Sequence, residues 1–269
     1  MLLIIFRLIF FFTLTFILLP FQIVIILFFN KLVYIIPNFY HKLCCRILGI
    51  RIKKSGKISN SKPTLFVSNH ASYVDIIILS SLFQTSFVAK KEVSHWPFLG
   101  ILAKLQNTIF IDRKIGSIAE QENLIIDHLK KNNNLIIFPE GTSSDGNQVL
   151  PFKSPLFNIF KNKTNPKINI QTITIIYKKE NGIKLNRSTR RDITWHSNME
   201  LIPNMINLLK KMTIEIEVVF NKKFIPCSNK NLFLGISKGP NLKEFIEAIG
   251  LAPIVNISLL IPPTPVAAP

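Results

Sequence analysis

The sequence predicts an α/β protein with a single mixed, mostly parallel sheet flanked by helices and preceded by an N-terminal hydrophobic membrane anchor. Short apolar strands alternate with helical segments, a rhythm typical of parallel βαβ units. Of the 269 residues, 48% are hydrophobic, which is enough for a substantial core. We expect four regions: an anchor over 1–30, a basic juxtamembrane linker over 31–62, the α/β domain over 63–250 and a Pro- and Ala-rich tail over 251–269.

The N-terminal run from Met1 to Phe29 is apolar apart from Arg7, Gln22 and scattered threonines. About 20 such residues are enough to cross the hydrocarbon core of a bilayer. A cleaved signal peptide is the alternative, but the run is longer than the usual apolar region of ~7–15 residues and no small-residue cleavage site follows it. Pro20 allows a kink, or a hairpin that enters only one leaflet. We therefore expect a retained anchor, either a span or a re-entrant hairpin.

The charge of the chain predicts an anionic partner. The formal net charge is +18, and Met1–Val74 contains nine basic residues and no acidic one. Such a balance suits nucleic acid or the negative face of a bilayer, although a merely solvated basic linker is compatible with it. Basic residues just after a membrane segment tend to stay cytoplasmic, so we expect the inner membrane with the catalytic domain facing the cytoplasm. The three cysteines have neither disulfide nor metal spacing, so we expect no metal and a reducing compartment.

The strands and helices of the α/β domain are expected in alternation. Apolar runs that end in polar turns predict strands, and apolar residues on one face predict helices. We expect strands over Thr64–Val67, Thr108–Ile111, Leu135–Phe138, Ile170–Tyr177 and Thr213–Phe220, and helices over Val74–Phe83, Trp96–Leu105 and Ile118–Lys131.

The densest polar cluster, Ser68–Asp75, follows the first of these strands. Open α/β sheets bind ligands at the carboxyl ends of their strands. If His70 lies in the loop and Asp75 in the first helical turn, the carboxylate can orient the imidazole, whose other nitrogen can then take a proton from a hydroxyl. The alternative is structural, because Ser72 and Asp75 also form an S-x-x-D capping box.

Two further polar clusters follow strands in the same way. In Phe138–Ser144, Gly141 permits close backbone approach, and Thr142 with nearby amides can hold a substrate oxygen. In Phe110–Arg113, the guanidinium of Arg113 suits a phosphate. Each has a simpler interpretation, a Pro-Gly turn in the first case and a surface ion pair in the second.

The three motifs in this order, N-H-x-S-x-x-D, F-I-x-R and F-P-E-G-T, resemble the glycerophospholipid acyltransferase family, which includes the lysophosphatidic acid acyltransferases. The resemblance covers about Asn69–Tyr177. It implies that His70 and Asp75 form a catalytic dyad. The histidine would deprotonate the acceptor hydroxyl, which attacks the thioester of acyl-CoA or acyl carrier protein directly. Neither an acyl-enzyme nor a cofactor is implied, and Ser72 is not the nucleophile.

The resemblance also implies roles in acceptor binding. Arg113 would bind the acceptor phosphate, while Glu140 and Gly141, with Thr142, would shape the acceptor site. Lys90 and Lys91 are additional phosphate candidates on charge alone. The strand Thr172–Tyr177 stands where the family has an apolar fourth motif but lacks the usual proline, so it receives no role.

One departure from the family pattern concerns the acceptor. The family often has F-P-E-G-T-R-S, and here Ser143 occupies the arginine position, which removes a charge-assisted partner for phosphate. The longer string F-P-E-G-T-S-S-D-G-N, and the stretch Trp195–Met199 with Glu200, Leu201 and Pro203, resemble a subgroup whose acceptor is lyso-ornithine lipid, which has no phosphate.

The leading hypothesis is acyl transfer to 1-acyl-sn-glycerol-3-phosphate, giving phosphatidic acid in phospholipid biosynthesis. The nearest alternative is transfer to lyso-ornithine lipid or another lysolipid. A membrane-tethered nucleic-acid-binding protein is suggested only by the charge, and the sequence contains no recognisable binding module for it. A structural membrane protein would not explain three polar clusters at strand ends. We therefore expect membrane lipid and an acyl thioester as partners, and no nucleic acid.

Overall fold

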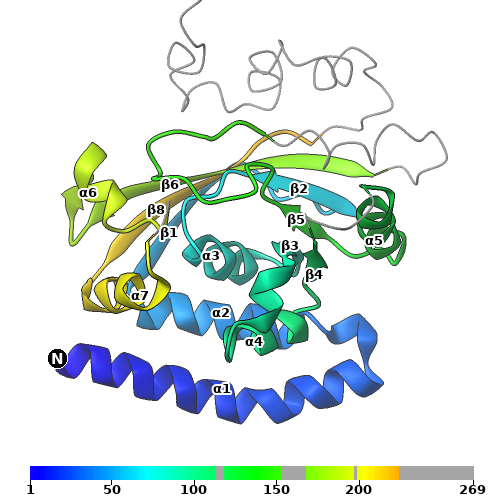
Figure 1. The fold of residues 1–269 in the computed structure, drawn as a ribbon, viewed down its shortest axis with the longest axis horizontal. Coiled ribbons are helices and arrows are strands. Elements are labelled where there is room, and N and C mark those ends of the chain that lie inside the picture. The colour runs from blue at the N-terminus through cyan, green and yellow to red at the C-terminus, as the bar shows by residue number, and fades with distance from the viewer. Residues whose placement is uncertain (113–117, 153–167, 197–198, 224–269) are drawn as a thin grey trace, which may run out of the picture.

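The computed structural model describes residues 1–112, 118–152, 168–196 and 199–223. Within them the chain forms one eight-stranded sheet with the strand order β1-β8-β6-β2-β5-β3-β4, and β7 pairs with β6 (Figure 1). The strands are β1 (Ile50–Ser55), β2 (Thr64–Ser68), β3 (Ser86–Lys90), β4 (Ile109–Ile111), β5 (Leu135–Ile137), β6 (Asn169–Glu180), β7 (Ile183–Lys184) and β8 (Ile214–Phe220).

Most neighbouring strands run parallel, so the predicted mixed, mostly parallel sheet is confirmed. Only the pairings of β6 with β7 and with β8 are antiparallel. The central strand β2 is buried at every residue, and so is β5, as expected of a parallel sheet with both faces covered. Since β2 lies between β5 and β6, the carboxyl ends of these three parallel strands open on one edge of the sheet.

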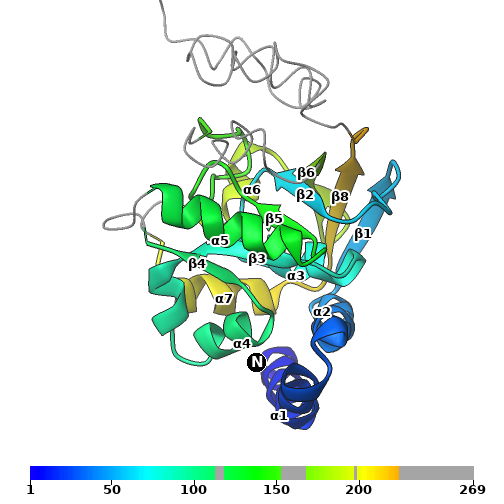
Figure 2. The same ribbon diagram turned by 90° about the vertical axis from the view of Figure 1, so that its right-hand side faces the viewer.

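Helices lie against this sheet in successive layers. They are α1 (Leu2–Phe28), α2 (Ile35–Ile47), α3 (Val74–Leu82), α4 (Leu99–Leu105), α5 (Ile118–Lys130), α6 (Arg187–Arg191) and α7 (Leu201–Lys210), with the short 3-10 helices η1 (Asn30–Leu32) and η2 (Lys91–His95). Helix α3 packs on the sheet, α2 packs on α3, and α1 is the outermost layer, as Figures 1 and 2 show.

The prediction of a basic linker over residues 31–62 is wrong. The segment contains α2 and the edge strand β1, which pairs parallel with β8 from Ile50 to Ser55. Helix α2 buries Pro37, Tyr40 and both adjacent cysteines, while its basic residues lie elsewhere on the helix. The basic side chains lie on the exposed faces of α2 and β1, so their charge led to the interpretation of this part of the domain as a linker. The predicted tail over 251–269 lies outside the described residues.

The N-terminal apolar run forms a single helix that continues through Pro20, so the chain does not turn back at that proline, which was one of the two alternatives for the anchor. By length and composition this helix could cross a membrane. Its buried residues are the polar Arg7, Thr15 and Gln22, which recur every seven or eight positions and so share one face. The Arg7 guanidinium donates to the carbonyls of Leu209 (2.9 Å) and Lys211 (2.6 Å) at the end of α7.

The other two polar residues fasten the rest of α1 to the domain. The Thr15 and Tyr40 hydroxyls are 2.9 Å apart, which joins α1 to α2. The Gln22 side-chain amide donates to the carbonyls of Val33 (2.9 Å) and Leu105 (2.7 Å). The helix is therefore held along its length against the domain, with apolar side chains on its outer face.

Candidate active site

The first polar cluster lies in the turn between β2 and α3. Strand β2 ends at Ser68, and Asn69 then binds the neighbouring strand β6 through both ends of its side chain. Its amide nitrogen donates to the Ile175 carbonyl (3.1 Å), and its oxygen accepts from the Ile175 N–H (2.8 Å). This clamp fixes the backbone immediately before His70. Asn69 opens the first motif, but no role of its own was predicted for it.

The structure brings His70 and Asp75 together. The imidazole Nδ1 is 2.9 Å from the Asp75 Oδ2, and the aspartate side chain is fully buried while 16% of the His70 side chain is exposed. A carboxylate at Nδ1 holds the proton on that nitrogen, which leaves Nε2 to accept a proton. The pair therefore has the geometry of an oriented general base.

The Asp75 carboxylate is held by three further donors. Its Oδ2 accepts from the backbone N–H groups of Ala71 (2.7 Å) and Ser72 (2.9 Å), and its Oδ1 accepts from the Tyr177 hydroxyl (2.7 Å). The bond from Ser72 is one of the two that a capping box requires, while the Asp75 N–H donates to the Ser72 carbonyl and not to its hydroxyl. The two interpretations of Asp75 are thus compatible, because one carboxylate begins α3 and also orients His70.

Tyr177 is a site residue that the sequence analysis missed. It lies on β6 and is 1% exposed, and its hydroxyl reaches Asp75 from 102 positions further along the chain. The missing proline in the fourth motif led us to assign that strand no role. A buried tyrosine at the end of an apolar strand was the available signal, since such a hydroxyl usually needs a partner.

The second polar cluster packs directly on the first. The ring of Phe138 stacks on the imidazole of His70, with centroids 4.1 Å apart and planes inclined by 19°. The Ser144 N–H donates to the His70 carbonyl (2.8 Å). The loop after β5 therefore holds both the ring and the backbone of the histidine.

Glu140 supports this arrangement from within the protein. Its Oε1 accepts from the His70 N–H and its Oε2 from the Leu150 N–H, both at 2.7 Å. The residue is 1% exposed, and burial raises the pKa of its carboxyl to about 8. Glu140 is not among the residues that line the cavity described below, whereas Gly141 and Thr142 are. Its contacts are those of a positioning residue for the loop that carries His70.

The other residues predicted to bind the acceptor lie in different places. Gly141 has φ +71°, the left-handed region that favours glycine, and turns the chain beside the cavity. Lys90 also lines the cavity, while the ammonium of Lys91 lies 3.1 Å from a carboxylate oxygen of Asp112. Arg113 lies outside the described residues.

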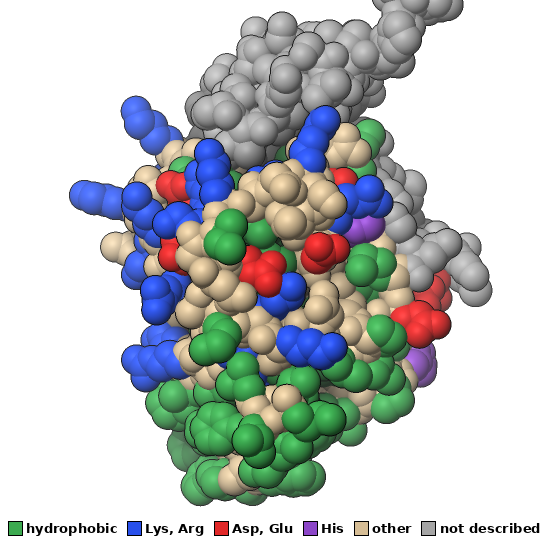
Figure 3. Space-filling view, turned by 90° about the vertical axis from the view of Figure 1, so that its left-hand side faces the viewer, with side chains coloured by type: hydrophobic (Ala, Val, Ile, Leu, Met, Phe, Trp, Pro, Cys, Tyr) green, Lys and Arg blue, Asp and Glu red, His purple; other side chains and the backbone are tan. Residues whose placement is uncertain are grey.

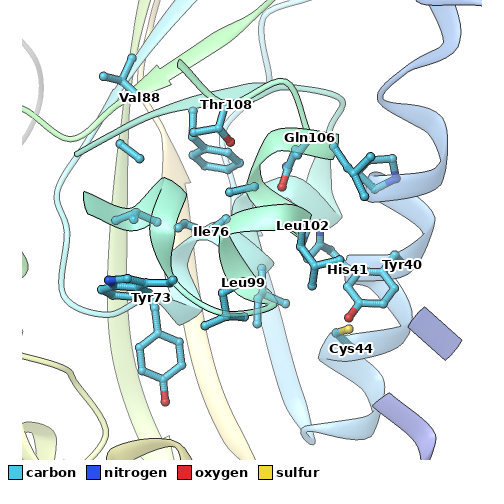
Figure 4. Close-up of a pocket in the computed structure, with 18 of the residues that line it drawn as sticks. Tyr40, His41, Cys44, Tyr73, Ile76, Val88, Leu99, Leu102, Gln106 and Thr108 are labelled. Atoms are coloured by element: carbon cyan, nitrogen blue, oxygen red, sulfur yellow. The ribbon is translucent and has the colours of Figure 1, made fainter. Parts of the chain in front are cut away.

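A cavity of about 670 Å³ extends from His70 to the N-terminal helices. Most of its lining is apolar. In Figure 4, Tyr73 and Val88 lie on one side of it, and Tyr40, His41 and Cys44 lie on the other. The volume is within the range of sites that enclose a small molecule, and apolar walls of this extent suit a hydrocarbon chain. An oriented base therefore opens onto a compartment for a lipid.

A His–Asp pair beside an apolar cavity fits the class of enzymes that act on lipids, and comparisons with known proteins show the family. The family model described as Acyltransferase matches residues 49–177. A lyso-ornithine lipid O-acyltransferase of Brucella abortus is 37% identical over 192 residues, which cover 70% of this chain and 72% of that protein. This chain belongs to the acyltransferase family.

Other relatives are named for either of two activities. A lyso-ornithine lipid O-acyltransferase of Rhizobium meliloti is 32% identical, covering 70% of this chain and 66% of that protein. A 1-acyl-sn-glycerol-3-phosphate acyltransferase of Neisseria gonorrhoeae is 30% identical, covering 58% of each. The crystal structure of the 1-acyl-sn-glycerophosphate acyltransferase PlsC from Thermotoga maritima has the same fold, with a TM-score of 0.62 at 15% identity, covering 93% of this chain and 95% of that chain.

We predict that Tyr177→Phe lowers kcat about 10-fold or more, because the Asp75 carboxylate loses a fixed donor and orients His70 less firmly. Unfolding free energy should fall by roughly 0.5–1.5 kcal/mol for the lost hydrogen bond. Tyr34→Phe is the matched control, since the buried Tyr34 hydroxyl contacts His128 and Asn107 instead. Thermal unfolding and initial rates should show a stability loss in both variants and a kcat loss in Tyr177→Phe alone. Equal rates in the two variants would remove Tyr177 from the site.

Proposed function

We propose that this acyltransferase moves a fatty acyl group from a thioester directly to the hydroxyl of a lysolipid, with His70 as general base and Asp75 orienting it. The observation that carries the proposal is the buried dyad at the wall of an apolar cavity. His70 Nε2 takes the hydroxyl proton as the oxygen attacks the thioester carbonyl. The tetrahedral intermediate collapses, the C–S bond breaks, and the imidazolium returns the proton to the departing thiolate. The donor is acyl-CoA or acyl carrier protein, and no cofactor is needed.

We propose lyso-ornithine lipid as the acceptor. Ser143, which stands where the family often has an arginine, lines the cavity and adds no charge. Phosphate binding would therefore lack a strong charge-assisted partner at this position. The relatives from Brucella abortus and Rhizobium meliloti support the same acceptor. This ranking reverses the order in which the sequence favoured the two lysolipids.

The packing of the loop after Ser143 gives independent support. Arg190 of α6 donates to the Asn147 side-chain oxygen (2.9 Å), and the Asn147 amide donates to the Arg187 carbonyl (3.0 Å). Further along, the Trp195 N–H donates to the carbonyl of Ala71, next to the catalytic histidine (2.9 Å). Ser143 and Trp195, one from each of the two stretches that resemble the lyso-ornithine subgroup, both line the cavity. Lysophosphatidate is the second candidate, favoured by Lys90 in the lining.

We also propose that α1 lies in the plane of the cytoplasmic leaflet of the inner membrane rather than crossing it. Arg7, Thr15 and Gln22 hold the helix against the domain along its length. Its outer face is broadly apolar and exposed, including Phe6, Ile9, Phe16, Phe21, Leu27 and Phe28. Figure 3 shows hydrophobic side chains gathered at the base of the molecule, where α1 lies, with lysines and arginines above them. An apolar face bordered by basic residues is typical of helices that bind anionic lipid in the interface.

His70→Ala should reduce acyl transfer by about 100-fold or more, the usual contribution of a positioned base. Asp75→Asn should also reduce it, because an amide does not hold the imidazole proton on Nδ1 in the same way. His95→Ala is the control, since His95 is exposed on η2. The measurement is product formation from palmitoyl-CoA and lyso-ornithine lipid in detergent micelles. Undiminished activity in His70→Ala, with membrane association intact, would exclude the dyad.

Ser143→Arg should shift the acceptor preference towards lysophosphatidate. The new guanidinium would supply a partner for the anionic phosphate, whereas the N-acylated ornithine head group is zwitterionic, with one ammonium and one carboxylate, and would gain less from it. We expect the ratio of kcat/KM for lyso-ornithine lipid to that for lysophosphatidate to exceed one in the wild type and to fall about 10-fold in the variant. Ser143→Ala controls for loss of the hydroxyl and should not favour lysophosphatidate. A wild type that uses only lysophosphatidate would contradict the proposed acceptor while leaving the dyad in place.

The placement of α1 predicts that both of its ends are on the cytoplasmic side. In inside-out inner-membrane vesicles, cysteines introduced by Leu2→Cys and Phe28→Cys should both react with a membrane-impermeant maleimide. Protection of one end until detergent is added would show that the helix crosses the bilayer. The native Cys44 and Cys45 are buried, and the unsubstituted chain measures their background labelling.

A further inference from the structure

The cavity contains a buried polar group that acyl transfer does not use. Gln22 of α1 is 4% exposed and lines the same cavity as His70. Its Nε2 donates to the carbonyls of Val33 and Leu105, at 2.9 Å and 2.7 Å. Among the described residues its Oε1 has no hydrogen-bond partner.

The orientation of this amide is fixed by its surroundings. Turning the Gln22 amide over would place its oxygen against two carbonyl oxygens, which offer no proton. The unpartnered atom is therefore the oxygen, an acceptor with both lone pairs unused. Leaving such an acceptor buried costs roughly 1–3 kcal/mol.

The part of the cavity around Gln22 is otherwise suited to hydrocarbon. Leu18 and Leu19 of the same helix, and Ile36 and Pro37 at the start of α2, line it with apolar surface. A saturated acyl chain in this space would fill the volume and leave the Gln22 oxygen without a donor. A chain that carries a hydroxyl would satisfy it.

On the cavity wall, the buried Tyr73 hydroxyl also has no partner among the described residues, whereas three other polar side chains are paired. Gln106, which follows the Leu105 that Gln22 binds, donates to the Ser80 hydroxyl (2.8 Å), and His41 Nδ1 lies 2.9 Å from the same hydroxyl. Thr15 lies 2.9 Å from the Tyr40 hydroxyl. Gln22 is thus distinguished from Thr15, Gln106 and His41 by an acceptor atom that is buried and has no partner among the described residues.

We propose that Gln22 Oε1 accepts a hydrogen bond from a hydroxyl on the donor's acyl chain, so that the enzyme prefers hydroxylated fatty acyl thioesters. The inference rests on the proposed function, because it takes the cavity to hold the transferred chain. The hydroxyl lies away from the thioester, since Gln22 belongs to α1 and contacts the end of α4, whereas His70 is in the turn before α3. Gln22 is then a specificity residue for the donor.

The test is a competition between donors. Wild-type enzyme in detergent micelles receives lyso-ornithine lipid or lysophosphatidate with an equal mixture of palmitoyl-CoA and one monohydroxypalmitoyl-CoA. The hydroxyl is placed near the thioester, in the middle of the chain or at its end, and the two products are counted by mass spectrometry. We expect at least one distal isomer to be preferred by roughly 3- to 10-fold, as one net hydrogen bond allows.

Two variants assign that preference to Gln22. Gln22→Lys keeps donors for the Val33 and Leu105 carbonyls but has no acceptor, and Gln22→Leu removes both. Each should bring the product ratio to one or below. Thr15→Val is the matched control, because it removes a cavity hydroxyl that is already paired, and it should keep the wild-type ratio.

Three results would overturn the proposal. The first is equal use of palmitoyl and every hydroxylated isomer by the wild type, which means that a water molecule satisfies Gln22. The second is a preference that survives in both Gln22 variants, and the third is a preference lost only in Thr15→Val. The product ratio of the wild-type enzyme tests the proposal even if the variants are unstable. Failure to transfer palmitate to either lysolipid would instead contradict the proposed function.

Discussion

The buried carboxylate of Asp75 is the group on which the rest of the site depends. Removing an ionised carboxylate from water is costly, so its position in the core requires donors from every side. They come from the imidazole of His70, from the N–H groups of Ala71 and Ser72, and from the Tyr177 hydroxyl on β6. The same carboxylate therefore holds the turn, the start of α3 and the imidazole of His70. Because one of its donors is on β6, the site requires β2 and β6 to be paired.

Glu140 extends this dependence to the loop after β5. Its carboxyl joins the backbone of His70 to that of Leu150, and Phe138 covers the imidazole ring. His70 is thus fixed at its ring, at its N–H and at its carbonyl by segments about 70 residues away in sequence. The F-P-E-G-T motif has a structural function here in addition to any contact with the acceptor. A base held so firmly loses little freedom when substrate binds.

The sequence predicted the parts of this structure that depend on local patterns. The contact of His70 with Asp75 and the strand before them could be predicted, because the motif and the apolar pattern each lie within a few residues. Tyr177 was not predicted, because its contact with Asp75 joins distant segments that only the sheet brings together. Strand β1 was not predicted, although Ile50 and Ile52 alternate with basic residues. The basic residues had been interpreted as part of a linker.

The family comparison identifies the family, which the fold alone does not, because many unrelated activities share α/β sheets. Its members act on either of two lysolipids. On the proposed assignment, the uncharged Ser143, in a loop that is bonded to α6, is the residue that separates them. Specificity would then lie at the edge of the cavity and reactivity at its buried wall.

Helix α1 has a consequence for how the protein can be handled. Phe11, Thr15, Leu18 and Gln22 of this helix line the cavity that begins at His70. The helix with the broad apolar outer face is therefore also a wall of the cavity. Removing this helix from the chain would open the cavity to water on one side.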